Sequence, residues 1–391
     1  MKELVHLAEE LKRGMYDGVK ITREDQSTRP IEVLDEVPKK QIEVLEKPAI
    51  RTFEVKRVKT ATGVFGLDSS SRTITSSLVF IAVSAGSIFN RFNGQGIDIP
   101  SVPAILGIEE PLCRHIVVVP EVDLGPGFAT LLEKAKSITI KNPISGTYTS
   151  SYNKNFLLVE LRLMIEQCLL EKFNEINNAE NTVLLIDGPL IYPHRVAEES
   201  PISRENVRVY VENVNHLNSS RVRAFKRTLR KGIILAGIVK RLNKSYYLSK
   251  ANPADLATGI INDEAYLTAL LMSNSEIEPP LVVGPLRVRQ DAEFGLNRIL
   301  WYIVVPRRWY YFMSSVDHYV TYRVEVLEDY LNFEDILSYI FYDSLGTGSL
   351  LPLSILVVDR RVKKISSSLT TYLLYNMGLP QESTSQYISI L

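Results

Sequence analysis

The order of apolar segments from residue 61 onward constrains the fold of this chain most strongly. Three segments with the short apolar runs of β-strands come first, over residues 62–72, 73–89 and 114–124. A long helix is predicted next, over residues 155–177, and after it strands and helices alternate. Strands followed by alternating helix and strand are typical of an α/β protein. We therefore expect a sheet with helices on its faces.

The remaining elements follow from the same patterns. A buried strand within residues 181–193 opens into a turn. The later predicted elements are strands at 232–240, 299–306 and 318–326 and helices at 222–231, 261–272, 333–341 and 362–377. Residues 1–60 contain an amphipathic helix over residues 1–15 and then a stretch rich in charge and proline. We interpret them as an N-terminal extension that packs or binds a partner, and residues 61–391 as the core domain.

Several classes of protein are excluded by what the chain lacks. It has 45 basic and 45 acidic residues, so only a local patch can indicate a nucleic-acid partner. Cys113 and Cys168 are too few for a structural zinc site, and we expect no disulfide framework and a reducing cytoplasm. The longest apolar stretch, residues 78–89, is shorter than the roughly 18 residues of a membrane span, so no membrane partner is expected. The chain also lacks the phosphate loop of many nucleotide-binding enzymes.

Two aspartates follow apolar strands at the point where each strand ends. Asp68 ends the first strand and is followed by three serines, and Asp187 ends the strand VLLID. Ligands of open α/β sheets gather outside the carboxyl ends of the strands, and paired carboxylates there suit Mg²⁺ or Mn²⁺. Each aspartate also suits a turn or a helix cap, which is the alternative interpretation.

A third carboxylate, Glu166, interrupts the apolar stripe of the helix at 155–177. A carboxylate on a buried face is costly unless it is paired, protonated or bound to a cation. We interpret Glu166 as a metal ligand, and the alternative is a buried salt bridge, for which Arg162 is one candidate partner. Glu160 is the rival on this helix, but its face carries further polar residues and we expect it to be solvated.

A basic run follows between residues 204 and 244, with eleven Lys or Arg against two acids. Such a local excess is the electrostatic footprint of phosphate binding, although a solvated helix face is the simpler alternative. The predicted DNA-binding residues are Arg221, Arg223, Lys226, Arg227, Arg230 and Lys231, together with Tyr246 as a platform for base stacking.

Taken in order, several motifs resemble the NurA nuclease family. They are GLDSSSR, the helix with Arg162 and Glu166, LLIDGPL, GIVKRLNKSYYLSK and TYRVEV, and the similarity covers roughly residues 60 to 378. The resemblance implies an RNase H-like mixed sheet and a Mn²⁺-dependent nuclease, with Mg²⁺ as a substitute ion. It also implies 5′–3′ exonuclease and single-strand endonuclease activity on DNA ends, in DNA repair by homologous recombination. The implied partners are a second copy of the chain, as a homodimer, and a HerA-type hexameric ATPase.

The same resemblance assigns roles to four residues. Asp68, Glu166 and Asp187 match the acidic metal ligands of the family, and Lys240 matches the lysine of its G-x-x-K strand. Asp68 and Asp187 are expected to hold the ion that the phosphate binds, and Glu166 to complete the coordination or orient water. Lys240 is expected to offset charge on the phosphate.

One motif of the family is missing. Family members usually end with P-x-P-L-x-x-A-H, whose histidine completes the site, whereas residues 351–361 read LPLSILVVDRR. Asp359 lies close to the expected position, and we expect its carboxylate to replace the imidazole as a metal ligand. The alternative is a non-catalytic DNA-binding or scaffold subunit that has lost the ability to cut.

Overall fold

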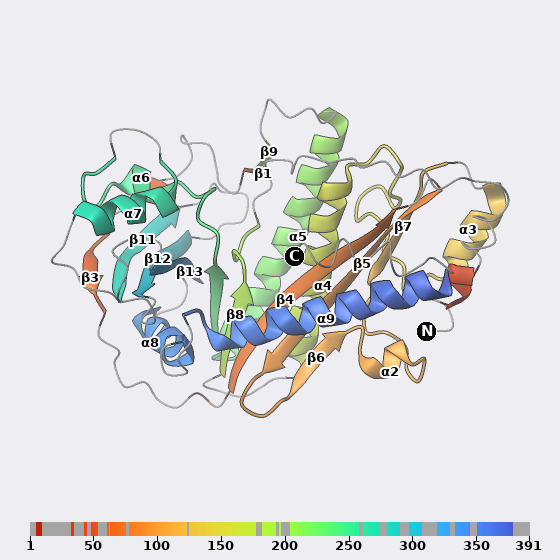
Figure 1. The fold of residues 1–391 in the computed structure, drawn as a ribbon, viewed down its shortest axis with the longest axis horizontal. Coiled ribbons are helices and arrows are strands. Elements are labelled where there is room, and N and C mark those ends of the chain that lie inside the picture. The colour runs from red at the N-terminus through yellow and green to blue at the C-terminus, as the bar shows by residue number, and fades with distance from the viewer. Residues whose placement is uncertain are drawn as a thin grey trace.

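The computed structural model describes the chain in separate ranges. These are residues 5–9, 33–34, 43–44, 48–53, 61, 63–75, 78–122, 125–176, 182–192, 195–196, 204–257, 261–273, 280–289, 297–306, 319–328, 333–344 and 350–377. Within these ranges an 11-stranded mixed sheet runs through the whole molecule, with helices on both faces (Figure 1).

The part of the sheet that matters most here has five strands. They lie in the order β10 (Ile234–Val239), β8 (Thr182–Asp187), β4 (Gly63–Thr75), β5 (Val79–Asn90) and β6 (Gly96–Ile99). The pairs β4–β5 and β5–β6 are antiparallel, whereas β8 is parallel to both β4 and β10. Three antiparallel strands joined to two parallel ones form the RNase H-like mixed sheet, and the expected fold class is confirmed.

The sheet continues beyond β10 on one side, and a short strand adds to β5. The further strands are β13 (Tyr319–Leu327), β12 (Asn297–Pro306), β11 (Leu281–Arg289), β2 (Glu43–Val44), β3 (Ile50–Thr52) and β7 (Ile116–Pro120). Strands β2 and β3 belong to the N-terminal extension and pair with β11 at the sheet edge. A separate ribbon joins β1 (Val33–Leu34) to β9 (Arg195–Val196).

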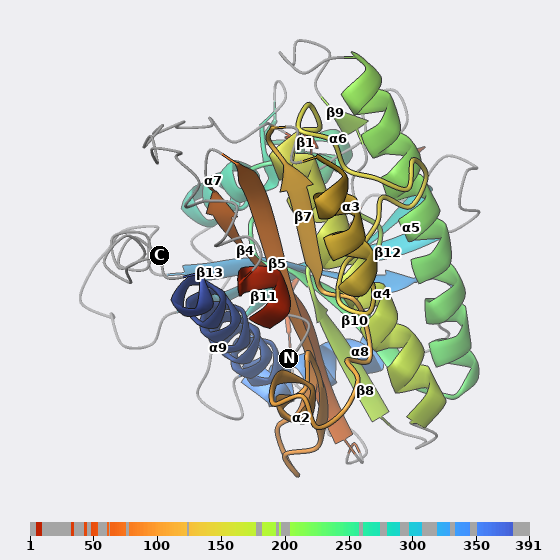
Figure 2. The same ribbon diagram turned by 90° about the vertical axis from the view of Figure 1, so that its right-hand side faces the viewer.

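Three long helices cover the sheet. Helices α4 (Lys154–Ile176) and α5 (Arg204–Arg230) pack together on one face, and α9 (Leu353–Asn376) crosses the other face over β4 and β5 (Figure 2). The apolar side chains of α4 and α5 bury Leu67 and Ile186, which alternate along their strands with residues that face α9. The smaller helices are α2 (Val102–Ile105), α3 (Gly125–Lys134), α6 (Tyr247–Ala251), α7 (Asp263–Ser273) and α8 (Phe333–Ser344).

Several observed elements differ from the predicted ones: helix α5 begins at Arg204 and not at Val222, and strand β11 was not predicted. Strand β4 extends to Thr75 and pairs with β5 along its whole second half, so residues 73–75 belong to the first strand. Strand β6 has no counterpart among the predicted elements. The last helix begins at Leu353 and not at Val362, because Ile355, Val358 and Val362 form one buried helical stripe. Asp359 therefore lies on a helix.

The N-terminal helix is described only over residues 5–9, where Leu7 and Ala8 pack against the C-terminal half of α9. The rest of the predicted helix lies outside the described residues. In the described part of the chain, no helix has both the length and the apolar character that a membrane crossing requires.

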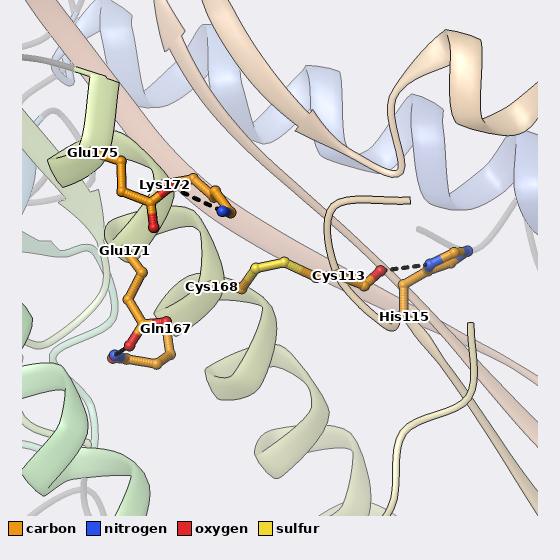
Figure 3. The surroundings of a disulfide bond; sticks show 7 residues. All are labelled: Cys113, His115, Gln167, Cys168, Glu171, Lys172 and Glu175. Atoms are coloured by element: carbon orange, nitrogen blue, oxygen red, sulfur yellow. Dashed lines mark hydrogen bonds and ion pairs between the residues drawn. A yellow bond between two sulfur atoms is a disulfide. The ribbon is translucent and has the colours of Figure 1, made fainter. Parts of the chain in front are cut away.

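The two cysteines form a disulfide, contrary to the sequence prediction. Cys168 of α4 is bonded to Cys113, which precedes β7, and their Cα atoms are 6.6 Å apart (Figure 3). The two residues are separated by 55 positions, and their approach depends on α4 packing across β5. The bond removes the support that the cysteines gave to a reducing compartment.

Candidate metal centre

Asp68 and Asp187 stand side by side on the face of the sheet that α9 covers. Strands β4 and β8 are parallel, and their last paired residues are Leu67 and Ile186, so the next residues are neighbours. Side chains alternate along a strand, and Leu67 faces α4, so Asp68 faces α9. Strand β8 ends at Asp187, whereas β4 continues past it.

Helix α9 brings a third carboxylate to this point. It approaches β4 closely because Gly66 has no side chain, and a Cβ there would overlap the carbonyl of Ser354. Little more than one turn after that contact, Asp359 lies next to Asp68 and Asp187. One carboxylate oxygen from each of the three aspartates lies within 4.8 Å of the other two. The structure therefore brings Asp359 to Asp68 and Asp187.

Two of the three carboxyl groups, those of Asp68 and Asp187, have raised pKa values. Burial, and then the nearby charges of Asp187 and Glu166, raise the pKa of Asp68 well above its ordinary value. Burial also raises the pKa of Asp187, although the ammonium of Lys240 opposes this shift. Lys240 lies at the end of β10, and its Nζ is 2.5 Å from Asp187 Oδ2. The predicted site lysine is thus in contact with the cluster.

The donor set suits a hard divalent cation. Asp68, Asp187 and Asp359 offer only oxygen atoms, at spacings that one ion can bridge. Carboxylate oxygens with room for water or phosphate oxygens suit Mg²⁺ or Mn²⁺, and neither cysteine lies in the cluster to favour a thiophilic metal. A cation there would relieve the repulsion that raises the pKa of Asp68.

Glu166 is not brought into this cluster. It is buried, and its carboxylate forms an ion pair with Arg221 of α5 instead of the suggested partner Arg162. Its other oxygen accepts a hydrogen bond of 2.7 Å from the hydroxyl of Ser69, whose backbone N–H donates to Asp68. Glu166 is therefore connected to Asp68 through Ser69, on the opposite face of β4.

The loop after Asp187 is held from two sides. Arg221 donates from Nε to the carbonyl of Leu190, and Glu325 of β13 accepts the backbone N–H of Leu190. The loop crosses close to β10 because Gly237 has no side chain, and a Cβ there would lie 2.7 Å from the carbonyl oxygen of Gly188. Glu325 was not predicted from the sequence, although a buried acid that alternates with valines in VEV was a usable signal.

The predicted DNA-binding residues divide into two groups. Arg221 is buried and paired with Glu166, which contradicts its predicted DNA contact, whereas Lys231 is partly buried and donates to the carbonyl of Asn174. The other four predicted cations, Arg223, Lys226, Arg227 and Arg230, are exposed side chains of α5. They lie on the helix pair that covers the face opposite α9 (Figure 2). Tyr246 is exposed at the start of α6.

Glu160 is buried, which corrects the expectation of a solvated side chain. Its carboxylate accepts hydrogen bonds from the hydroxyls of Tyr148 and Tyr152 and from the amide of Asn213. Helix α4 is enclosed by the sheet on one side and α5 on the other, so polar residues on its second face are also covered. Burial raises the pKa of Glu160 to about 7.

Comparison with known proteins gives one family. Residues 62–363 match the family model described as the NurA domain. No curated protein sequence matches the chain. Among solved structures, the chain is similar to the NurA nuclease from Sulfolobus solfataricus, with 11% identity, 81% of this chain and 85% of that chain covered, and a TM-score of 0.41. The crystal structure of NurA bound to dAMP and manganese is 11% identical, covers 80% and 85% of the two chains, and has a TM-score of 0.35.

Proposed function

Because the chain belongs to the NurA family, we propose that it is a divalent-metal-dependent deoxyribonuclease whose metal ligands are Asp68, Asp187 and Asp359. The observation that supports this proposal most is the meeting of the three carboxylates. They come from residues far apart in the chain, and they share a partly buried position that their mutual repulsion disfavours without a cation. Without a bound cation, this arrangement lowers the stability of the folded protein.

We assign a role to each residue of the site from its contacts. A divalent cation supplies a polarised phosphate and a hydroxide from bound water at neutral pH. Asp68, Asp187 and Asp359 hold that ion, and the ammonium of Lys240, next to Asp187, offsets charge on the phosphate. Glu166 acts through Ser69 by holding the backbone around Asp68, and in this proposal it is a positioning residue and not a direct ligand.

The finer assignments rest on the family resemblance. They are Mn²⁺ as the ion, single-stranded DNA and DNA ends as substrates, 5′–3′ exonuclease and single-strand endonuclease activity, and a role in DNA-end repair. A homodimer and a HerA-type hexameric ATPase are the proposed partners, and the cytoplasm, where such a substrate would lie, is the proposed location. One of the NurA crystal structures contains manganese together with dAMP.

The decisive experiment is cleavage of labelled single-stranded DNA with Mn²⁺ and with chelator. The parent should cut only with the metal, and Asp68→Asn and Asp187→Asn should each abolish cutting. Glu110→Gln, an exposed acid outside the cluster, is the matched control and should cut like the parent. If the parent binds DNA but does not cut it with any divalent metal, the nuclease proposal is wrong. The protein would then be the non-catalytic scaffold that the missing histidine suggests.

A further inference from the structure

A second lysine lies beside the three carboxylates, on α9. Lys363 is one helical turn beyond Asp359, and its Nζ lies 2.9 Å from Asp359 Oδ2. Its side chain is 60% exposed, so the ammonium can leave this partner without being dehydrated. Lys240 contacts Asp187 from β10, so two of the three carboxylates each contact an ammonium.

The two sides of α9 differ in what they contact. Arg361 lies on the side that faces β5 and β6, where it pairs with Asp98 and stacks over the ring of Phe89. Asp359 and Lys363 lie on the other side, towards the strand end of β8. There β4 continues from Asp68 to Thr75, and among the described residues no strand pairs with it on that side.

This free stretch of β4 carries a cation on the same face as Asp68. Ser70 and Arg72 alternate with the residues that face α4, and the Ser70 hydroxyl contacts the hydroxyl of Ser366 on α9. The Nε of Arg72 is buried and has no hydrogen-bond partner in the described part of the chain. A polar path therefore leads from the carboxylates along the free edge of β4, with Lys363 above it and Arg72 farther on.

We propose that Lys363 and Arg72 bind the phosphodiester backbone of the substrate strand next to the metal site, on the α9 face of the sheet. This inference rests on the proposed nuclease function and extends it by naming the side from which the strand is held. When a cation is bound at Asp359, Lys363 would lose this partner, and its ammonium would be free to bind a phosphate next to the ion.

The position of the carboxylates favours this face over α5. Asp68, Asp187 and Asp359 lie on the α9 face, whereas the exposed cations of α5 lie on the helices of the opposite face (Figure 2). A strand held by α5 alone would have to pass around the end of the sheet to reach the ion. A strand held by Lys363 reaches it directly.

The test measures binding apart from cutting. A fluorescent single-stranded oligonucleotide is titrated in Ca²⁺, at several salt concentrations, with the full chain and its variants. Lys363→Ala should weaken binding roughly fivefold and lower the salt slope by about 0.7 per lost phosphate contact. Lys364→Ala is the matched control, because this exposed lysine is rotated about 100° around the same helix turn. It should bind like the parent.

Cutting with Mn²⁺ separates this inference from the function on which it rests. Lys363→Ala should raise KM several-fold with a smaller change in kcat, and Arg72→Ala should do the same to a lesser degree. If the parent cuts and Lys363→Ala matches Lys364→Ala in affinity, salt slope and KM, the inference is wrong and the nuclease stands. If the parent neither cuts nor binds the oligonucleotide, both are wrong. Urea unfolding of each variant shows that the fold is retained.

Discussion

The buried carboxyl of Glu160 makes the stability of the protein depend on pH in a direction that can be calculated. Burial raises its pKa from the ordinary value of 4.5 to about 7 in the folded state. The folded state therefore keeps a proton that the unfolded chain releases. The contribution of this proton to the free energy of unfolding is fully present below pH 4.5 and is lost as the pH rises through 7. A difference of about 2.5 pKa units corresponds to about 3 kcal/mol.

The perturbation that tests this is Glu160→Gln, because glutamine has the shape of the protonated acid and does not titrate. Urea unfolding of parent and variant at pH 5, 6, 7 and 8 gives the difference in the free energy of unfolding at each pH. Between pH 5 and pH 8 the free energy of unfolding of the variant should rise relative to that of the parent by roughly 2–3 kcal/mol. Glu175→Gln, on the same helix but exposed, should show no such trend. A difference for Glu160→Gln that is constant with pH would refute the reasoning.

Three further changes have predictable results. Asp359→His should retain Mn²⁺-dependent cutting of single-stranded DNA and Asp359→Ala should lose most of it, as measured by the cleavage rate, because imidazole also suits Mn²⁺. Gly66→Ala should lower the free energy of unfolding by roughly 1–3 kcal/mol and weaken Mn²⁺ binding in a titration, because the added Cβ pushes α9 and Asp359 away from β4. Reduction of the Cys113–Cys168 bond, which closes a 55-residue loop, should cost up to about 4 kcal/mol in urea unfolding, and no change on reduction would contradict the bond.

The sequence alone determined the order of the central strands along the chain, but it placed only Asp187 correctly at a strand end, because β4 continues past Asp68. Hydrophobic periodicity is a local property, so β8 and β10 were predictable within a few residues. Strands β4 and β8 are parallel neighbours whose pairing stops at Leu67 and Ile186, so the next residues, Asp68 and Asp187, come close together although β4 continues to Thr75. The approach of Asp359 to this pair was also predictable, because the residue stands near the place of a known motif.

The tertiary structure decided which charged groups meet. Glu160 and Glu166 lie six positions apart on one helix, yet one is held by tyrosines and the other by Arg221, 55 residues away. Lys363 was overlooked because its importance depends on α9 docking over Gly66, which places the helix beside Asp68. Burial of a side chain is set by the elements that pack around it, and no local pattern reports which of them carries the opposite charge. The sequence thus shows where acids stand along their strands and helices, and only the packing of α4, α5 and α9 decides their partners.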